Sequence, residues 1–469
     1  MTNKMKRFVQ ILAVALVVAA CGTKEPEVKY VFYFIGDGMG INHVVGTEQY
    51  NAATGMGPDS INFNHFPVRN YISTFSLTSL VTDSAAAGTA LATGFKTYDG
   101  AVGLDQDKHP VPNLAEMAKA AGCGVAVMSS VGVNHATPSC FLAHAEKRNL
   151  YGSLAEQLCD SQADFIAGAC FMTGRKPEHP REYYENMAQE KGYAIFRGPD
   201  VSAAGFADGK VICLSGKQDL QLPYAIDRQE DDTSLKDFVS AGIAYMERHY
   251  LDKGFFMMVE GGEIDYAGHS NDAVACFREL TDMAYCVDLA LEFQARHPET
   301  LIVVTADHET GGLMLSSGGY VIHPERLAWQ KYSIDRTTEL FREAFFPEGE
   351  PYKAPSWEQV KSFLAEHFGL WENVEVPQKE EENLKKVYAE TFGKGGDRNL
   401  SVKNLYTENY KMVSEAILCL DCIAGYQWSH PDHSGSPVGL YVKGAADDRF
   451  NTVKDNAQIA PIIAELAGY

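Results

Sequence analysis

Short, uninterrupted apolar runs separated by helical stretches are the feature that most constrains the fold of this 469-residue chain. The runs recur at residues 31–35, 124–130, 210–214, 254–259 and 301–305. Because polar residues do not alternate with apolar ones, both faces of each strand must be covered, as in a parallel sheet between layers of helices. The sequence therefore predicts an α/β fold, a three-layer α/β/α sandwich with a mainly parallel central sheet.

The segment from about 320 to 426 has a different character. We predict that it is a helical insert within a domain that spans residues 30–469, because it combines charged helical stretches with connectors rich in Pro, Gly and Glu. Ser356 and Gln359 have the spacing of a capping box, which predicts a helix that ends at Phe368. Three of the four tryptophans lie in this segment, and we expect them to form its small core. The alternative is that they narrow access to a binding site.

The first 20 residues have the pattern of an export signal. Three basic residues precede an apolar run at positions 8–18 that is too short to span a bilayer as a helix. Small residues then lead to Cys21, an arrangement that resembles the lipobox of bacterial lipoproteins. We expect residues 1–20 to be a lipoprotein signal peptide, Cys21 the lipidation site and residues 21–29 a tether. The product would be exported and lipid-anchored to a bacterial membrane, in the periplasm or at the cell surface. An uncleaved anchor and an ordinary secretory signal are the alternatives.

The chain is strongly acidic, with 62 acidic residues, 40 basic residues and a formal charge of −22. Removal of residues 1–20 would take away three basic residues and leave a charge of −25. This charge excludes a nucleic-acid partner. It would also repel a phosphorylated substrate, unless the site holds positive charge that no side chain supplies. The hydrophobic content of 45% excludes a disordered or fibrous protein.

Polar side chains follow three of the apolar runs, at the point where each predicted strand ends. They are Asp37, Glu260, Asp265, Asp307 and His308. The carboxyl ends of parallel strands meet at one edge of a sheet, which is where ligands bind. So many carboxylates would repel one another, and divalent cations resolve the conflict. The mixture of Asp and His suits zinc, whereas oxygen ligands alone suit magnesium.

Two local patterns add to this prediction. Asp265 and His269 are four residues apart, so one helical turn would bring both side chains to the same metal. Ser84 follows Asp83 at the start of an alanine-rich stretch, where a helix N-terminus would stabilise an alkoxide. A neighbouring metal would then make the hydroxyl nucleophilic without a histidine base. Taken alone, Asp83 and Ser84 are more typical of an ordinary helix cap than of a nucleophile.

Six motifs in order resemble the alkaline phosphatase family. The resemblance covers about residues 30–320 and 427–469, and the region between is where such enzymes carry variable inserts. The motifs are Gly36–Gly40, Thr82–Thr93, His135–Pro138 with Arg148, Glu260–Asp265 with His269, Thr305–Glu309, and His433–Gly435.

The resemblance implies a role for each matched residue. Ser84 would be the nucleophile that forms a phosphoserine, and Arg148, oriented by Asp83, would grip two phosphate oxygens. Two zinc ions and one magnesium ion are implied. One zinc would be held by Asp265, His269 and His433. The second would be held by Asp37, Asp307 and His308. The magnesium would be held by Asp37, Thr137 and Glu260.

Two positions depart from the family pattern. His135 stands where some bacterial members carry an aspartate, and Tyr266 stands where some carry a lysine and others a histidine. A histidine near the third metal favours zinc or cobalt, or holds a bound water. The third ion is therefore left open between magnesium and another divalent metal, with His135 as an additional candidate ligand.

The resemblance implies hydrolysis of phosphate monoesters at alkaline pH through a phosphoserine, with release of inorganic phosphate. A homodimer is expected from the family. A related phosphodiesterase or sulfatase-like hydrolase is one alternative, but such relatives carry a threonine or a modified cysteine as nucleophile and lack the combination of Arg148 with Thr137 and Glu260. A non-catalytic, metal- or phosphate-binding lipoprotein is the other. It would require the loss of a ligand or of the nucleophile, and the sequence retains all of them.

Overall fold

The computed structural model describes residues 28–217, 219–316, 318–347, 352–403 and 406–469. The predicted signal peptide, Cys21 and most of the predicted tether lie outside these residues. Within the described part of the chain, no helix combines the length and the apolar character needed to cross a membrane.

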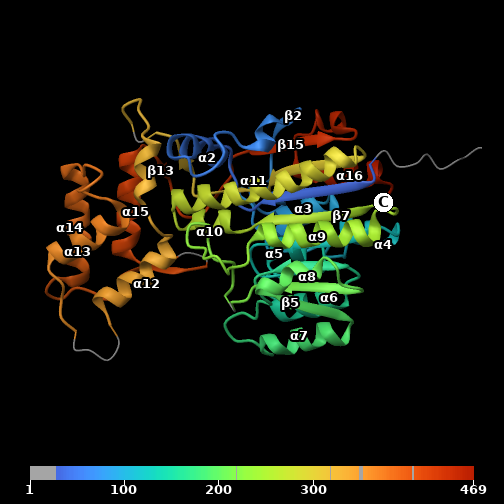
Figure 1. Ribbon diagram of the computed structural model, residues 1–469, viewed down its shortest axis with the longest axis horizontal. Coiled ribbons are helices and arrows are strands. Elements are labelled where there is room, and N and C mark those ends of the chain that lie inside the picture. Colours follow the sequence, from blue (N-terminus) through green and yellow to red (C-terminus); the bar gives the residue numbers. More distant parts are fainter. Residues whose placement is uncertain (1–27, 218, 317, 348–351, 404–405) are drawn as a thin grey trace, which may run out of the picture.

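A nine-stranded sheet forms the centre of the molecule (Figure 1). Its strands, in spatial order, are β2 (Val68–Ile72), β15 (Val438–Gly444), β8 (Thr300–Ala306), β1 (Tyr30–Gly36), β7 (Phe255–Gly261), β3 (Gly124–Ser129), β4 (Phe165–Gly168), β6 (Lys210–Leu214) and β5 (Tyr193–Arg197). All neighbours from β8 to β5 are parallel, whereas β15 runs antiparallel to β8 and β2. The prediction of a mainly parallel sheet is confirmed, and the single antiparallel strand β15 beside the edge strand β2 is a feature that the apolar runs did not predict.

The register of the three central strands brings their polar ends together. Gly36 of β1 lies opposite Gly261 of β7 and Ala306 of β8. Asp37 and Asp307 therefore leave the sheet at the same level. Glu260 lies one residue earlier on the neighbouring strand.

Side chains of alternate strand residues point to opposite faces of the sheet. Because both sets are apolar in the central strands, helices cover both faces. Phe32 and Phe255 pack against Phe293 on one face, and Phe256 packs against Tyr469 on the other. The face of Phe293 is covered by α9 (Leu235–Tyr250) and α11 (Ala273–Arg296), and α2 (Ile41–Thr54) packs against α11. The opposite face is covered by α4 (Leu114–Ala120) and α16 (Ile459–Ala467), and α3 (Ser84–Thr93) packs against both of these helices. The other helices of this part are α5 (Ala136–Ser139), α6 (Tyr151–Asp160), α7 (Arg181–Glu190), α8 (Val201–Ala204) and α10 (Glu263–His269).

The segment predicted as an insert lies beyond one end of the sheet, in orange in Figure 1. It contains α12 (Ile334–Phe345), α13 (Trp357–Phe368), α14 (Gln378–Phe392), a hairpin of β11 (Ser401–Lys403) and β12 (Glu408–Tyr410), and α15 (Lys411–Ala424). The predicted capping box is confirmed, since the Ser356 side chain accepts a hydrogen bond from the backbone N–H of Gln359 at the start of α13. These helices enclose a second hydrophobic core, which Tyr50 of α2 and Phe277 of α11 join to the rest of the molecule.

Two short antiparallel ladders close the base of this segment. β9 (Glu309–Thr310) pairs with β14 (His433–Ser434), so that Thr310 lies opposite His433. β10 (Leu313–Met314) pairs with β13 (Gln427–Trp428). The chain therefore leaves for the helical segment and returns from it at neighbouring points, directly beside the end of β8.

Replacement of Phe341 by alanine should destabilise the helical segment by about 3–5 kcal/mol, because Phe341 is fully buried and its removal leaves a cavity. Its ring packs against the rings of Phe345, Phe363, Phe392 and Tyr410. Urea denaturation followed by tryptophan fluorescence measures the effect, since three of the four tryptophans lie in this segment. The control is Phe206→Ala, which removes a ring that is 67% exposed and should change stability by less than about 0.5 kcal/mol. Equal urea midpoints for the two variants would contradict the prediction.

Candidate active site

The site lies at the carboxyl end of β1, β7 and β8, and local chain geometry explains the position of each side chain. Asp37 and Asp307 directly follow their strands. β7 leads through Gly262 into α10, whose helical turn places Asp265 and His269 on one side. The β9–β14 ladder brings His433 next to these residues.

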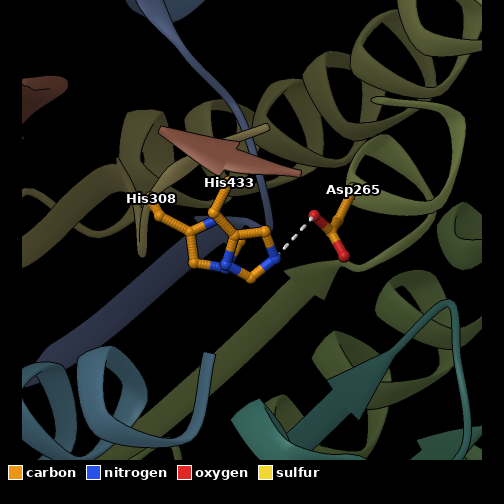
Figure 2. Close-up of side chains that lie close together, drawn as sticks. All are labelled: Asp265, His308 and His433. Carbon is orange, nitrogen blue, oxygen red and sulfur yellow. Dashed lines mark ion pairs between the residues drawn. The ribbon is translucent and has the colours of Figure 1, made fainter. Parts of the chain in front are cut away.

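Three groups of acidic and histidine side chains in this region have ligand atoms that lie within 4.8 Å of one another. The first group is Asp265, His308 and His433 (Figure 2). The second is Asp37, Asp307 and His308, and the third is Asp37, His135 and Glu260. Thr137 lies beside the third group, with its Oγ1 3.5 Å from Asp37 Oδ2. Asp37 and His308 each belong to two groups, so the three groups form one continuous cluster.

The imidazole rings of the cluster are close together. Figure 2 shows His433 and His308 side by side, with ring centroids 3.6 Å apart, and His433 Nε2 lies 3.7 Å from Asp265 Oδ1. His269 Nε2 lies 3.3 Å from Asp265 Oδ2 and 3.1 Å from His433 Nε2. The structure thus places His269 next to the first group.

Backbone carbonyls fix how two of these histidines are oriented. His269 Nδ1 lies 2.6 Å from the carbonyl oxygen of Pro431, and His433 Nδ1 lies 2.9 Å from that of Thr82. A carbonyl oxygen only accepts hydrogen bonds, so Nδ1 donates in both rings and each Nε2 faces the cluster. Two Nε2 atoms 3.1 Å apart can share a proton or can both bind one metal ion. This is the usual arrangement of metal-binding histidines.

The carboxylates of the cluster also have the character of metal ligands. Each of four carboxylates has one buried oxygen that finds no hydrogen-bond partner among the described residues, namely Asp37 Oδ1, Glu260 Oε1, Asp265 Oδ2 and Asp307 Oδ2. His135 Nδ1 is a fifth such atom. Buried polar atoms are almost always paired, and leaving a charged one unpaired is costly. The residues therefore fit a set of bound divalent cations.

Electrostatics within the cluster lead to the same conclusion. Burial, followed by the charge of Asp307, raises the pKa of Asp37 well above its ordinary value. Burial, followed by the charge of Asp265, raises the pKa of Asp307 to about 8. Burial also acts to raise the pKa of Asp265, but the neighbouring His269 holds that pKa well below its ordinary value. Positive charge is thus what this cluster needs in order to keep its carboxylates ionised.

Ser84 is the first residue of α3, and its hydroxyl lies at the junction of the cluster and an arginine. Ser84 Oγ is 3.2 Å from His308 Nε2 and 3.3 Å from Arg148 Nη1. Asp83 caps the helix, and its Oδ1 accepts hydrogen bonds from the backbone N–H groups of Ala86 and Gly100 at 3.0 and 2.9 Å. A buried hydroxyl at a helix N-terminus is well placed to act as a nucleophile.

Arg148 is held from two sides. Its Nη1 donates to Asp83 Oδ2 at 3.2 Å, and its Nη2 donates to His135 Nε2 at 3.1 Å and to Tyr406 Oη at 3.2 Å. Burial opposes ionisation of Asp83, but Arg148 and the two backbone N–H groups hold the pKa of Asp83 below its ordinary value. The ion pair therefore persists at neutral and alkaline pH, and the guanidinium is fixed beside Ser84.

Three residues at the site were not predicted from the sequence. Ser129 donates to Glu260, and Thr310 lies 3.2 Å from His308 Nδ1. The position of Ser129 at the site follows from strand pairing, because Ser129 lies opposite Glu260. The position of Thr310 follows from the sequence, because Thr310 lies two residues after His308. Tyr406 comes from the helical segment, and no local sequence pattern marks it.

Comparison with known proteins agrees with this geometry. The alkaline phosphatase family profile matches residues 28–170 and 211–469. Alkaline phosphatase 4 of Bacillus subtilis (strain 168) is 29% identical over 94% of this chain and 89% of its own length. Alkaline phosphatase of Escherichia coli (strain K12) is 29% identical over 61% of this chain and 70% of its own length.

Among solved structures, the cold-active alkaline phosphatase from a psychrophilic Shewanella sp. superposes with a TM-score of 0.75 and 28% identity, over 93% of this chain and 99% of that one. The match extends along nearly the whole described chain, on both sides of the helical segment. With a nucleophile candidate, a fixed arginine and a cluster of ligand atoms at one sheet edge, the chain belongs to the alkaline phosphatase family of phosphomonoesterases.

Proposed function

We propose that this phosphomonoesterase works through a phosphoserine formed on Ser84, at alkaline pH, and releases inorganic phosphate. The observation that carries the proposal is the place of Ser84 Oγ, which lies between His308 Nε2 at 3.2 Å and Arg148 Nη1 at 3.3 Å. A hydroxyl so placed can attack a phosphoryl group whose oxygens are held by the same arginine.

The reaction proceeds in two displacements. Ser84 Oγ forms a bond to phosphorus while the bond from phosphorus to the leaving oxygen breaks, and the alcohol departs with a proton. Water then attacks the phosphoserine, and the Ser84–phosphorus bond breaks to give inorganic phosphate and the free hydroxyl. The N-terminus of α3 stabilises negative charge on Ser84 Oγ, and the planar fork of Arg148 binds two non-bridging oxygens. Asp83 keeps that fork in place.

The ligand groups fit the ions that the family uses. Asp265, His269 and His433 would hold one zinc, and Asp37, Asp307 and His308 a second. Asp37, Thr137 and Glu260 would hold a magnesium or another divalent ion, with His135 as an additional ligand. When bound, such ions lower the pKa of a coordinated hydroxyl or water and stabilise charge on the transferred phosphoryl group.

Two further proposals concern the cellular setting. The sequence pattern before Cys21 supports export and a lipid anchor. Large exposed apolar side chains support a homodimer. Tyr71 of β2 is 65% exposed, Leu80 in the following loop is 84% exposed, and Phe75 and Leu77 of that loop and Phe95 after α3 are also exposed. A monomer in sedimentation equilibrium would contradict the dimer. Activity found only in the soluble fraction of cells would contradict the anchor.

Replacement of Ser84 by alanine should reduce hydrolysis of p-nitrophenyl phosphate at least about 1,000-fold, because the variant cannot form the covalent intermediate. The initial rate at alkaline pH measures the effect. The matched control is Ser153→Ala, which removes an exposed hydroxyl on α6 and should leave the rate unchanged. Undiminished activity of Ser84→Ala would rule out this mechanism. A preference of the wild-type protein for bis-p-nitrophenyl phosphate would rule out the substrate class.

Removal of metal with EDTA should abolish activity and lower the melting temperature, because the buried carboxylates then lose their cations. Zinc together with magnesium should restore both properties. Metal analysis of His433→Ala should show about one tightly bound ion fewer per chain than the wild type, because His433 supplies a ligand atom to the first group. The control is His109→Ala, in a surface group with Asp105 and Asp107, which should leave the tightly bound metal unchanged. Full activity in the presence of EDTA would exclude a metal-dependent reaction.

A further inference from the structure

Tyr406 is the residue through which the helical segment reaches the candidate active site. It lies just before β12, and the hairpin that carries it is fixed to α12, since Asn409 Nδ2 donates to Asp335 Oδ1 at 3.0 Å. Tyr406 Oη accepts a hydrogen bond from Arg148 Nη2 at 3.2 Å and lies 3.4 Å from His135 Nε2. Burial raises the pKa of the Tyr406 hydroxyl well above its ordinary value, so the hydroxyl stays neutral beside the arginine.

The ring of Tyr406 is stacked on the ring of Tyr266. The two centroids are 3.8 Å apart, and the planes are inclined by 22°. Tyr266 is itself buried and directly follows Asp265. We call Tyr266 and Tyr406 the tyrosine pair. One of its rings belongs to α10 and the other to the helical segment, so the pair forms only where these two parts of the chain meet.

The tyrosine pair extends from the arginine to the first ligand group. The hydroxyl end of Tyr406 lies at Arg148, and its ring centroid lies 5.5 Å from that of His269, with the planes inclined by 67°. The pair therefore borders the site on the side of Asp265, His269 and His433.

We infer that the leaving group departs on this side, an inference that rests on the proposed function. In phosphoryl transfer, the attacking and leaving oxygens lie roughly in line on opposite sides of phosphorus. Ser84 Oγ attacks from the side of His308 and Arg148. With phosphorus bound in front of Ser84, the leaving oxygen would point away from α3, and we infer that it faces the part of the site that His269 and the ring of Tyr406 border.

We propose that Tyr406 is a specificity-determining residue, and that the tyrosine pair favours phosphate monoesters with a planar aromatic leaving group over those with a small alkyl group. Aromatic rings gain from stacked and edge-to-face contacts with one another beyond the burial of their area. A methyl or glyceryl group offers no such face. The hydroxyl of Tyr406 orients the ring through Arg148, but the ring provides the selectivity.

The test compares kcat/KM for phenyl phosphate with kcat/KM for glycerol phosphate. Tyr406→Ala should lower this ratio about 3- to 10-fold relative to the wild type, and Tyr406→Leu, which keeps apolar bulk without a planar ring, should lower it as well. Tyr406→Phe should keep the ratio within about twofold, because the ring remains stacked on Tyr266. The two esters differ in intrinsic reactivity, but this difference cancels when the kcat/KM ratio of a variant is divided by that of the wild type for the same two esters.

A matched control removes a tyrosine of the helical segment away from the site. Tyr388 lies on α14, where its hydroxyl donates to the carbonyl of Pro355. Tyr388→Ala should loosen the segment and leave the selectivity ratio unchanged. An equal fall of the ratio in Tyr388→Ala and Tyr406→Ala would overturn the proposal, because the effect would then belong to the segment as a whole.

Binding gives a second readout that does not depend on turnover. Calorimetry should show that the preference of the protein for phenylphosphonate over methylphosphonate falls about 3- to 10-fold in Tyr406→Ala and is retained in Tyr406→Phe. An unchanged preference in Tyr406→Ala and Tyr406→Leu would overturn the proposal. A wild-type protein that hydrolyses neither ester would refute the proposed function instead, and the phosphonate preference would still decide the role of Tyr406.

Discussion

Buried negative charge at the carboxyl end of β1, β7 and β8 is the constraint on which the rest of the site depends. Asp37, Glu260 and Asp307 are fully buried, and within the part of the chain that the structure describes each keeps one oxygen without a hydrogen-bond partner. Groups in this situation either take up protons or attract cations. The fold itself creates the situation, because three parallel strands end at one level. The histidines held by backbone carbonyls then complete a set of donors that suits divalent ions.

The same constraint explains how a protein with a charge of −22 acts on an anionic substrate. With the proposed ions in place, their charge exceeds that of Asp37, Glu260, Asp265 and Asp307 together. Asp83 is neutralised separately by Arg148. The site is then locally positive within an acidic surface, and the field close to it attracts phosphate. The expectation that the net charge disfavours polyanionic partners is therefore compatible with the binding of a small anion.

Much of the sheet was predictable because its strands are covered on both faces. Continuous apolar runs define β1, β3, β6, β7 and β8, and the polar residues that follow three of these strands meet as expected. The antiparallel strand β15, which lies between β2 and β8, was not predicted, since its direction depends on the path of the chain through the helical segment. His433 was located by the family resemblance alone, because its place is set by pairing with Thr310. No local sequence pattern indicated that Tyr406 would lie at the site. Its approach to Arg148 depends on how the second core packs against Tyr50 and Phe277.

The two ladders at the base of the helical segment have a consequence for how such enzymes diversify. Because β9 pairs with β14 and β10 pairs with β13, the residues on either side of the segment are locked to each other independently of what lies between them. Evolution can lengthen, shorten or replace the intervening chain at this point without displacing His308 or His433. The ligand residues His308 and His433 are thereby kept apart from the helical segment, whose sequence is free to change. New substrate preferences can arise by exchange of one modular segment, while the reaction itself is inherited intact.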